Sequence, residues 1–123
     1  MNQEIAKKAA KYVQDNNWVS FPELLRLLEK EGVETKGNLC MHAPNDPNLI
    51  FWTEMSNDAC DIANDLTETH NIVLLSGSVM AYMADGAVQK MPLAKRAQAR
   101  GFKKPHWLPV FFCRPGTEKK GKK

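Results

Sequence analysis

The sequence predicts an α+β fold: a single domain with three main helices, a small and mostly antiparallel sheet, and a basic C-terminal extension. Three observations support this prediction. Apolar residues recur at helical spacing in three stretches before Thr69, short runs rich in β-branched and aromatic residues follow, and cations concentrate in the last third of the chain. The 123 residues are 43% hydrophobic and 25% charged, a composition typical of one globular domain and not of a disordered or fibrous chain.

The first two helices are predicted from apolar spacing and from their end signals. Four apolar residues share one helical face over residues 4–16, namely Ile5, Ala9, Tyr12 and Val13. Trp18-Val19 suits a short extended link. The run Ser20-Phe21-Pro22-Glu23 then has the form of a capping box, which predicts the start of the second helix, and Gly32 stands where a left-handed C-terminal cap is expected.

A stretch rich in Pro, Asn and Asp separates the second helix from the third. Residues 33–48 are predicted as a loop around a short strand at 39–42, and the apolar run 49–52 as a buried strand. Ser56 predicts the start of the third helix, which continues to Thr69. The exposed face of this helix is expected to be acidic, since it carries Asp58, Asp61, Asp65 and Glu68.

Strands are predicted to follow the third helix. Residues 72–75 and 79–84 have the β-branched, apolar character of strands. Asp85-Gly86 is a strong signal for a two-residue turn, because both central positions of that turn need positive φ. A hairpin over residues 79–91 is therefore expected, with Pro92 ending its return strand.

The end of the chain is predicted as a short helix, a loop and a last strand. Residues 93–100 are rich in good helix formers, and Pro105 favours a loop over residues 102–107. The last strand covers residues 108–113, with Pro109 at a sheet edge or at the strand start.

One domain and a cytoplasmic location are expected. The domain covers residues 1–116, with the basic extension 92–116 packed on it, and residues 117–123 form a disordered basic tail. The longest apolar run is far shorter than the roughly 18 residues of a membrane-spanning helix, and the N-terminal stretch lacks the apolar core of a secretory signal. Three widely spaced cysteines do not suit a disulfide framework.

The charge is divided unevenly along the chain. Residues 1–89 carry six Lys/Arg and 13 Asp/Glu, a net charge of −7, whereas residues 90–123 carry 11 Lys/Arg and the single acid Glu118, a net charge of +10. An acidic body with a basic last third suggests an anionic partner, with nucleic acid as the first candidate. A solvated basic tail is the alternative interpretation for the terminal lysines.

The candidate binding residues lie in and around the run from Arg100 to Trp107, in which cations alternate with aromatic residues. Such a run can neutralise phosphates and stack a base. The phosphate-binding candidates are Lys90, Lys95, Arg96, Arg100, Lys103, Lys104 and Arg114. Phe102 and Trp107 are the candidates for stacking on a base or ordering the loop, and packing in the core is the alternative for both.

The order of elements resembles the winged-helix variety of the helix-turn-helix fold. The resemblance covers residues 5–91: the stripe from Ile5 to Val13, the capping run at Ser20, the helix from Ser56, and the expected hairpin at 79–91. It implies a third helix in the DNA major groove and a wing touching the flanking backbone, or contact with a protein. Two departures are evident: a long link before the third helix, and no Lys or Arg between Glu54 and His70. Carboxylates in the groove oppose DNA binding, which moves the expected contact to the basic third.

Catalysis, metal binding and a cofactor are not expected. Cys40 and His42 stand one residue apart with no second ligand pair, so a structural zinc site is not indicated. Ser76-Gly77-Ser78 suits a loop between strands, and no phosphate-binding glycine motif is present. Cys60 and Cys113 are expected to pack as small apolar side chains.

The sequence thus predicts a non-enzymatic, regulatory nucleic-acid-binding domain, with DNA favoured over RNA. The alternative is a protein-interaction module of winged-helix type, whose acidic third helix or basic C-terminal face meets a partner of opposite charge. Self-association of the two faces into a homodimer belongs to this alternative. A membrane partner is not expected.

Overall fold

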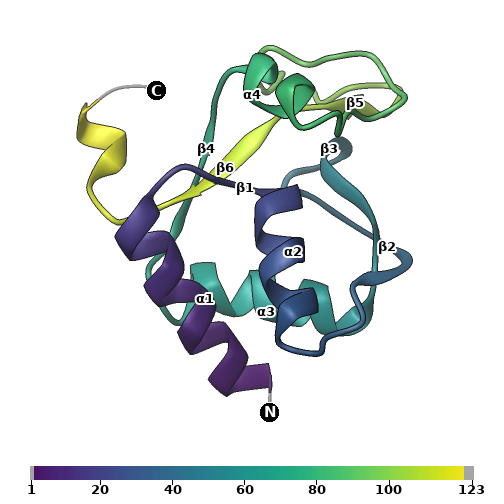
Figure 1. Cartoon of the computed structure of the whole chain (residues 1–123). Helices are drawn as coiled ribbons and strands as arrows, with labels where there is room; N and C mark the ends of the chain where they lie inside the picture. Colours follow the sequence, from purple (N-terminus) through teal and green to yellow (C-terminus); the bar gives the residue numbers. More distant parts are fainter. Residues whose placement is uncertain (1, 121–123) are drawn as a thin grey trace.

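The computed structural model describes residues 2–120, and within them the chain is a mixture of helices and two small sheets (Figure 1). The α+β prediction is confirmed at this level. In chain order the elements are α1 (Asn2–Asn16), β1 (Val19–Ser20), α2 (Phe21–Lys30), β2 (Lys36–Ala43), β3 (Asp46–Met55), α3 (Asn57–Glu68), β4 (Val73–Ser76), α4 (Val79–Ala84), β5 (His106–Trp107), β6 (Val110–Cys113) and the 3₁₀ turn η1 (Thr117–Lys120).

The three longer helices begin and end close to where the sequence predicts. Ser20 and Ser56 are the N-caps of α2 and α3: the Oγ of Ser20 accepts the N–H of Glu23, and that of Ser56 accepts the N–H of Ala59. Gly32 follows α2 with φ +87°, in the left-handed region that favours glycine. The three helices pack together in the lower half of Figure 1, with their apolar faces in one core.

The first sheet has the order β1-β6-β4 and is antiparallel throughout. All four residues of β6 are buried, and Pro109 stands just before this strand. The last strand is therefore the centre of a sheet, flanked by strands from both halves of the chain. β6, the last strand of the predicted extension over residues 92–116, therefore lies in the core of the domain.

The second sheet has the order β2-β3-β5. β2 and β3 form an antiparallel hairpin turned by Pro44 and Asn45. The strand predicted at 39–42 is confirmed and lies within β2, whereas the loop predicted on either side of it is wrong for residues 36–38 and 46–48, which also belong to strands. The predicted strand 49–52 is the middle of β3. β5 pairs with β3 in parallel, which corrects the predicted loop at His106 and Trp107. The β3–β5 pairing joins distant parts of the chain, and no local sequence pattern predicts it.

Residues 79–84 form helix α4, so the predicted strand and the hairpin at Asp85-Gly86 are wrong. The Oγ of Ser78 accepts the N–H of Met80 and caps this helix. Gly86 follows with φ +70°, so the turn signal ends a helix and does not join two strands. The β-propensity of this run gives way to the cap and to the full burial of Tyr82.

The helix predicted over residues 93–100 is also absent from the structure. Leu93 forms an isolated bridge to Trp107, and the N–H of Ala94 donates to the Trp107 carbonyl at 2.7 Å. A helix of two turns is marginal without packing to support it. The bonds to Trp107 hold this segment in an irregular path.

The predicted disordered tail is ordered at its start. Thr117 begins η1 and is buried, and its hydroxyl accepts the side-chain N–H of Asn17 at 3.1 Å. The rest of the predicted tail, residues 121–123, lies outside the described residues.

An aromatic cluster joins the two sheets to α4. The ring of Tyr82 lies 5.6 Å from that of Trp52 and 5.3 Å from that of Trp107. Its hydroxyl donates to the carbonyl of Val110 and accepts the N–H of Phe21. Burial raises the pKa of Tyr82, so the hydroxyl keeps the proton that it donates. The cluster fixes β5, and therefore the segment that leads into β5.

Candidate nucleic-acid interface

The segment before β5 is a loop whose two ends are held together. We name residues 95–104 the basic loop. At its base the N–H of Ala94 donates to the carbonyl of Trp107, and the N–H of Trp107 donates to the carbonyl of Pro92 at 2.8 Å. Leu108, just after β5, donates its N–H to the carbonyl of Ile50 in β3. The loop therefore leaves and rejoins the body at one place.

A buried carboxylate anchors the far part of the basic loop. Asp46, at the start of β3, accepts the N–H of Phe102 at 2.9 Å and the N–H of Asn48 at 3.0 Å. The side-chain amide of Asn48 donates to the Phe102 carbonyl at 2.7 Å. Gly101 has φ +74°, and a Cβ atom there would stand 3.3 Å from the Asp46 carboxylate. Glycine at 101 therefore lets the loop close on its anchor.

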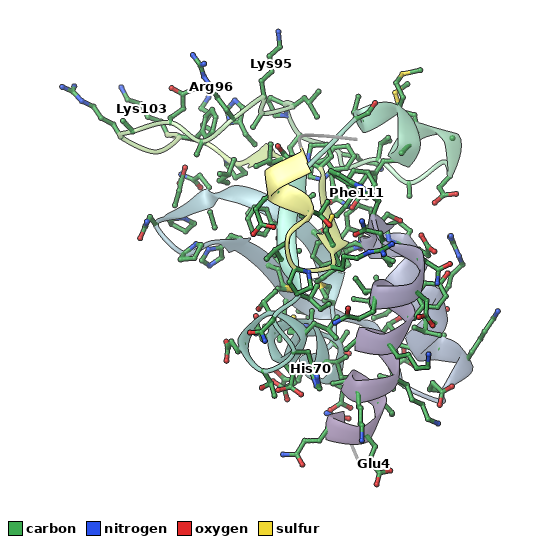
Figure 2. The ribbon with its side chains drawn as sticks, turned by 90° about the vertical axis from the view of Figure 1, so that its left-hand side faces the viewer. Glu4, His70, Lys95, Arg96, Lys103 and Phe111 are labelled. Carbon is green, nitrogen blue, oxygen red and sulfur yellow. The ribbon has the colours of Figure 1, made fainter. Side chains whose placement is uncertain are left out.

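The cations of the basic loop are exposed, and none of them forms an ion pair with an acid of the described residues. The loop carries five cations and no acid: Lys95, Arg96, Arg100, Lys103 and Lys104. Within residues 2–120, none of the ion pairs includes any of them. Figure 2 shows Lys95, Arg96 and Lys103 projecting from the end of the molecule that lies away from α1 and α3. Their charge is thus free of internal compensation by ion pairing.

The other two candidate cations occupy different places. Lys90 is exposed in the irregular segment between α4 and the basic loop. Arg114 is exposed after the far end of β6, where its N–H donates to the side-chain carbonyl of Asn17 at the end of α1. The structure therefore does not bring Arg114 to the loop, because β6 runs away from β5 toward the helices (Figure 1).

The two candidate aromatic residues differ in burial. Trp107 is 2% exposed, and its Nε1 donates to the Phe51 carbonyl at 3.2 Å. Its ring is therefore covered by the protein, and its backbone bonds hold the base of the loop. Phe102 is half-buried and stacks on His106, with ring centroids 4.1 Å apart and planes 22° apart.

A cleft of about 560 Å³ opens beside this stacked pair. Phe102 and His106 line it together with Lys95 and Arg96, and Gln98 adds an amide. Gln98 and the anchor Asp46 are not among the candidate residues predicted from the sequence. The four-residue spacing of Phe102 and His106 around Pro105 is the available signal for the stack, and it is a weak one.

The opposite end of the molecule is acidic. Asp61, Asn64 and Glu68 of α3 are exposed, and Glu4 and His70 lie at the end remote from Lys95 (Figure 2). The Asn2 side chain donates to Asp58 at 2.9 Å, so α1 packs along α3. α3 therefore presents carboxylates and not cations to a ligand.

The remaining observations concern possible metal ligands, the Cys60 thiol and the length of the helices. No group of three or more His, Cys, Asp or Glu within residues 2–120 could hold a metal ion. Burial raises the pKa of the Cys60 thiol, in keeping with a side chain that packs. None of the described helices has the length and apolar character needed to cross a membrane. Comparison with protein-family models, with curated proteins and with solved structures gives no match.

Proposed function

We propose that the protein is a non-enzymatic nucleic-acid-binding domain of winged-helix type that contacts phosphates through its basic loop. One observation carries the proposal: five exposed cations share an anchored loop that contains no acid, and none of them takes part in the ion pairs of the described residues. Phosphate contacts of Lys and Arg supply most of the sequence-independent affinity for nucleic acid.

The strand topology supports the winged-helix part of the proposal. β4 and β6 follow the third helix and pair with each other, and β1, between the first two helices, completes their sheet. In a winged-helix domain the strand pair after the third helix is the wing. On this assignment the wing connection is residues 77–109, and the basic loop lies within it.

The charge of α3 favours contact through the loop over contact through this helix. Its exposed residues include Asp58, Asp61 and Glu68, and it has no Lys or Arg. Carboxylates at the surface of a duplex are repelled by the phosphates. We therefore assign no groove-reading role to α3.

DNA remains the favoured ligand over RNA, and the cytoplasm the expected compartment. The competing hypothesis is a protein-interaction module, including a homodimer in which the acidic end of one copy meets the basic loop of another. Nucleic acid is preferred because a phosphate backbone matches a row of cations without needing an apolar interface centre.

The test compares two triple variants of equal charge loss. K95Q/R96Q/K103Q removes three loop cations, and K7Q/K30Q/K36Q removes three exposed cations elsewhere. Binding of labelled single- and double-stranded DNA and RNA is measured by fluorescence anisotropy from about 50 to 200 mM salt. We expect the loop variant to bind at least about tenfold more weakly than the wild type. The slope of log K against the logarithm of the salt concentration should become shallower by about two to three, because each lost phosphate contact removes roughly one released counterion.

The control variant should bind within about twofold of the wild type. Both variants should unfold within about 0.5 kcal/mol of the wild type, since exposed substitutions seldom change stability more. If both variants lost affinity equally, the binding would depend on the net charge of the protein and not on the basic loop, and the proposal would be overturned. Absence of binding to all four ligands at low salt would overturn the proposal in favour of a protein partner.

A further inference from the structure

The cleft beside the basic loop combines an aromatic face, cations and a polar edge group. The stacked rings of Phe102 and His106 line it, and both side chains are only half-buried. Its volume of about 560 Å³ lies within the range of small-molecule sites, roughly 300–1,000 Å³. The cleft is therefore large enough for a single planar ring system with its sugar.

The stack offers a surface suited to a nucleobase. The two rings are stacked, both are only half-buried, and both line the cleft, so the pair offers aromatic surface to a third ring. Leu93, 46% exposed, adds an apolar side chain to the same wall. Bases stack on such surfaces with little dependence on their identity, because every base has a π face.

The cleft is also lined by polar residues that can bind the phosphate and the base edge of a nucleotide. Lys95 and Arg96 line the cleft and belong to the cations without an acidic partner. Gln98 presents an amide, which can both donate to and accept from a base edge. An aromatic face with cations beside it is the arrangement that single-strand binding sites use.

The anchoring of Phe102 makes the stack a built feature of the loop. Asp46 and Asn48 hold the Phe102 backbone on both its N–H and its carbonyl. His106 lies in β5, whose register with Leu49 is fixed by the second sheet. The two rings are thus positioned by separate hydrogen-bonded elements, which lowers the entropy lost when a third ring joins them.

We infer that this cleft binds one unpaired nucleotide of a single-stranded nucleic acid, with its base on the Phe102–His106 stack and its phosphate beside Lys95 and Arg96. The inference rests on the proposed function and deepens it. A base in a duplex has both faces covered by its neighbours, so only an unpaired or extruded base can reach the stack. Single strands should accordingly bind more tightly than duplexes of equal phosphate number.

The experiment separates base stacking from phosphate binding. Full-length protein is titrated with four labelled probes of equal length: single-stranded DNA, single-stranded RNA, duplex DNA, and a DNA strand in which every position is abasic. The abasic strand keeps the phosphates and lacks the bases. A second readout places 2-aminopurine in the DNA strand, because its fluorescence falls when the base stacks.

Phe102→Leu removes the ring and keeps an apolar side chain. We expect it to weaken single-strand binding about tenfold and to abolish the 2-aminopurine quenching, with unchanged affinity for the abasic strand. His106→Leu is the second variant, and it should act in the same direction. Phe51→Leu is the matched control, since Phe51 is a half-buried phenylalanine of β3 that does not line the cleft.

The outcomes distinguish this inference from the proposed function. Tight binding of the abasic strand, or equal single-strand binding by wild type, F102L and H106L, would overturn the nucleotide site and leave phosphate binding standing. Failure of all four probes to bind would overturn both. Loss of binding in F102L for DNA but not for RNA, or the reverse, would support the site and assign its sugar preference.

Discussion

The aromatic cluster around Tyr82 and the basic loop adjoin each other and differ in how their polar groups are satisfied. In the cluster, the Tyr82 hydroxyl both donates and accepts, and the Trp107 indole N–H finds a backbone carbonyl. In the loop, the backbone is anchored through Phe102, yet the charged side chains have no partner among the ion pairs of residues 2–120. The polar groups of the first region are satisfied within the fold, whereas the loop cations take no part in the ion pairs of residues 2–120.

The comparison indicates how hydrogen-bonded anchors can hold a loop that carries five cations in one place. Five like charges on a free segment would repel one another and spread the loop over many conformations. Here the loop is tied at its base by Trp107 and at its far side by Asp46. The anchors hold the cations at one end of the molecule, as Figure 2 shows for Lys95, Arg96 and Lys103.

The largest effect is expected from Trp107→Ala. Trp107 is almost fully buried and packs on Tyr82 and Trp52, so its truncation should lower the free energy of unfolding by about 3–5 kcal/mol. Urea denaturation followed by circular dichroism measures the change. Phe102→Ala, which truncates a half-buried aromatic residue of the loop, should cost clearly less. Equal losses in the free energy of unfolding for the two variants would contradict the difference between the cluster and the loop.

A smaller and more local effect is expected from Asp46→Ala. The substitution removes the acceptor for the Phe102 and Asn48 amides, and a hydrogen bond to a charged group contributes about 1.5–3 kcal/mol. Hydrogen exchange at the Phe102 amide should become faster, while the amides of β4 keep their protection.

Asp61→Ala is the matched control for the loss of one carboxylate. Asp61 is exposed on α3, so its substitution should leave exchange at Phe102 unchanged. If Asp46→Ala speeds exchange equally in β4 and in the loop, the loop is not a separate unit of local opening.

The smallest effect on stability is expected when the pH is raised and the hydrogen bond between Tyr12 of α1 and Glu23 of α2 is lost. The hydrogen bond that Tyr12 donates to Glu23, with burial as a second cause, raises the pKa of Tyr12 above its ordinary value of 10.0. The stability this bond contributes is fully present below that value and is lost as the pH rises through the folded-state pKa. The stability difference between wild type and Tyr12→Phe should therefore be constant below about pH 9 and shrink as the pH rises above about 10.

Chemical denaturation at a series of pH values measures this difference. Tyr82, the other tyrosine of the chain, is present in both proteins, so its own titration cancels. A difference that stays constant or grows with pH would contradict the assignment of the shift to the Tyr12–Glu23 bond.

The cations of the candidate interface could be predicted from the sequence, but the positions of its aromatic residues could not. The run of cations from Lys95 to Lys104 is evident in the sequence, because charge is a property of each residue. The burial of Trp107 and the stacking of Phe102 on His106 depend on the parallel pairing of β5 with β3. Arg114 belongs with the other cations by sequence and lies apart from them in space.

The sequence by itself determined the three longer helices, their caps at Ser20 and Ser56, and the division of charge between the two parts of the chain. These features arise from interactions within one or two turns, or from composition. Only the tertiary structure decided that residues 79–84 are helical, that residues 93–100 are not, and that β6 is a central strand. In each case the burial of Tyr82 or Trp107, or hydrogen bonding between distant segments, outweighs a local propensity worth less than about 1 kcal/mol per residue.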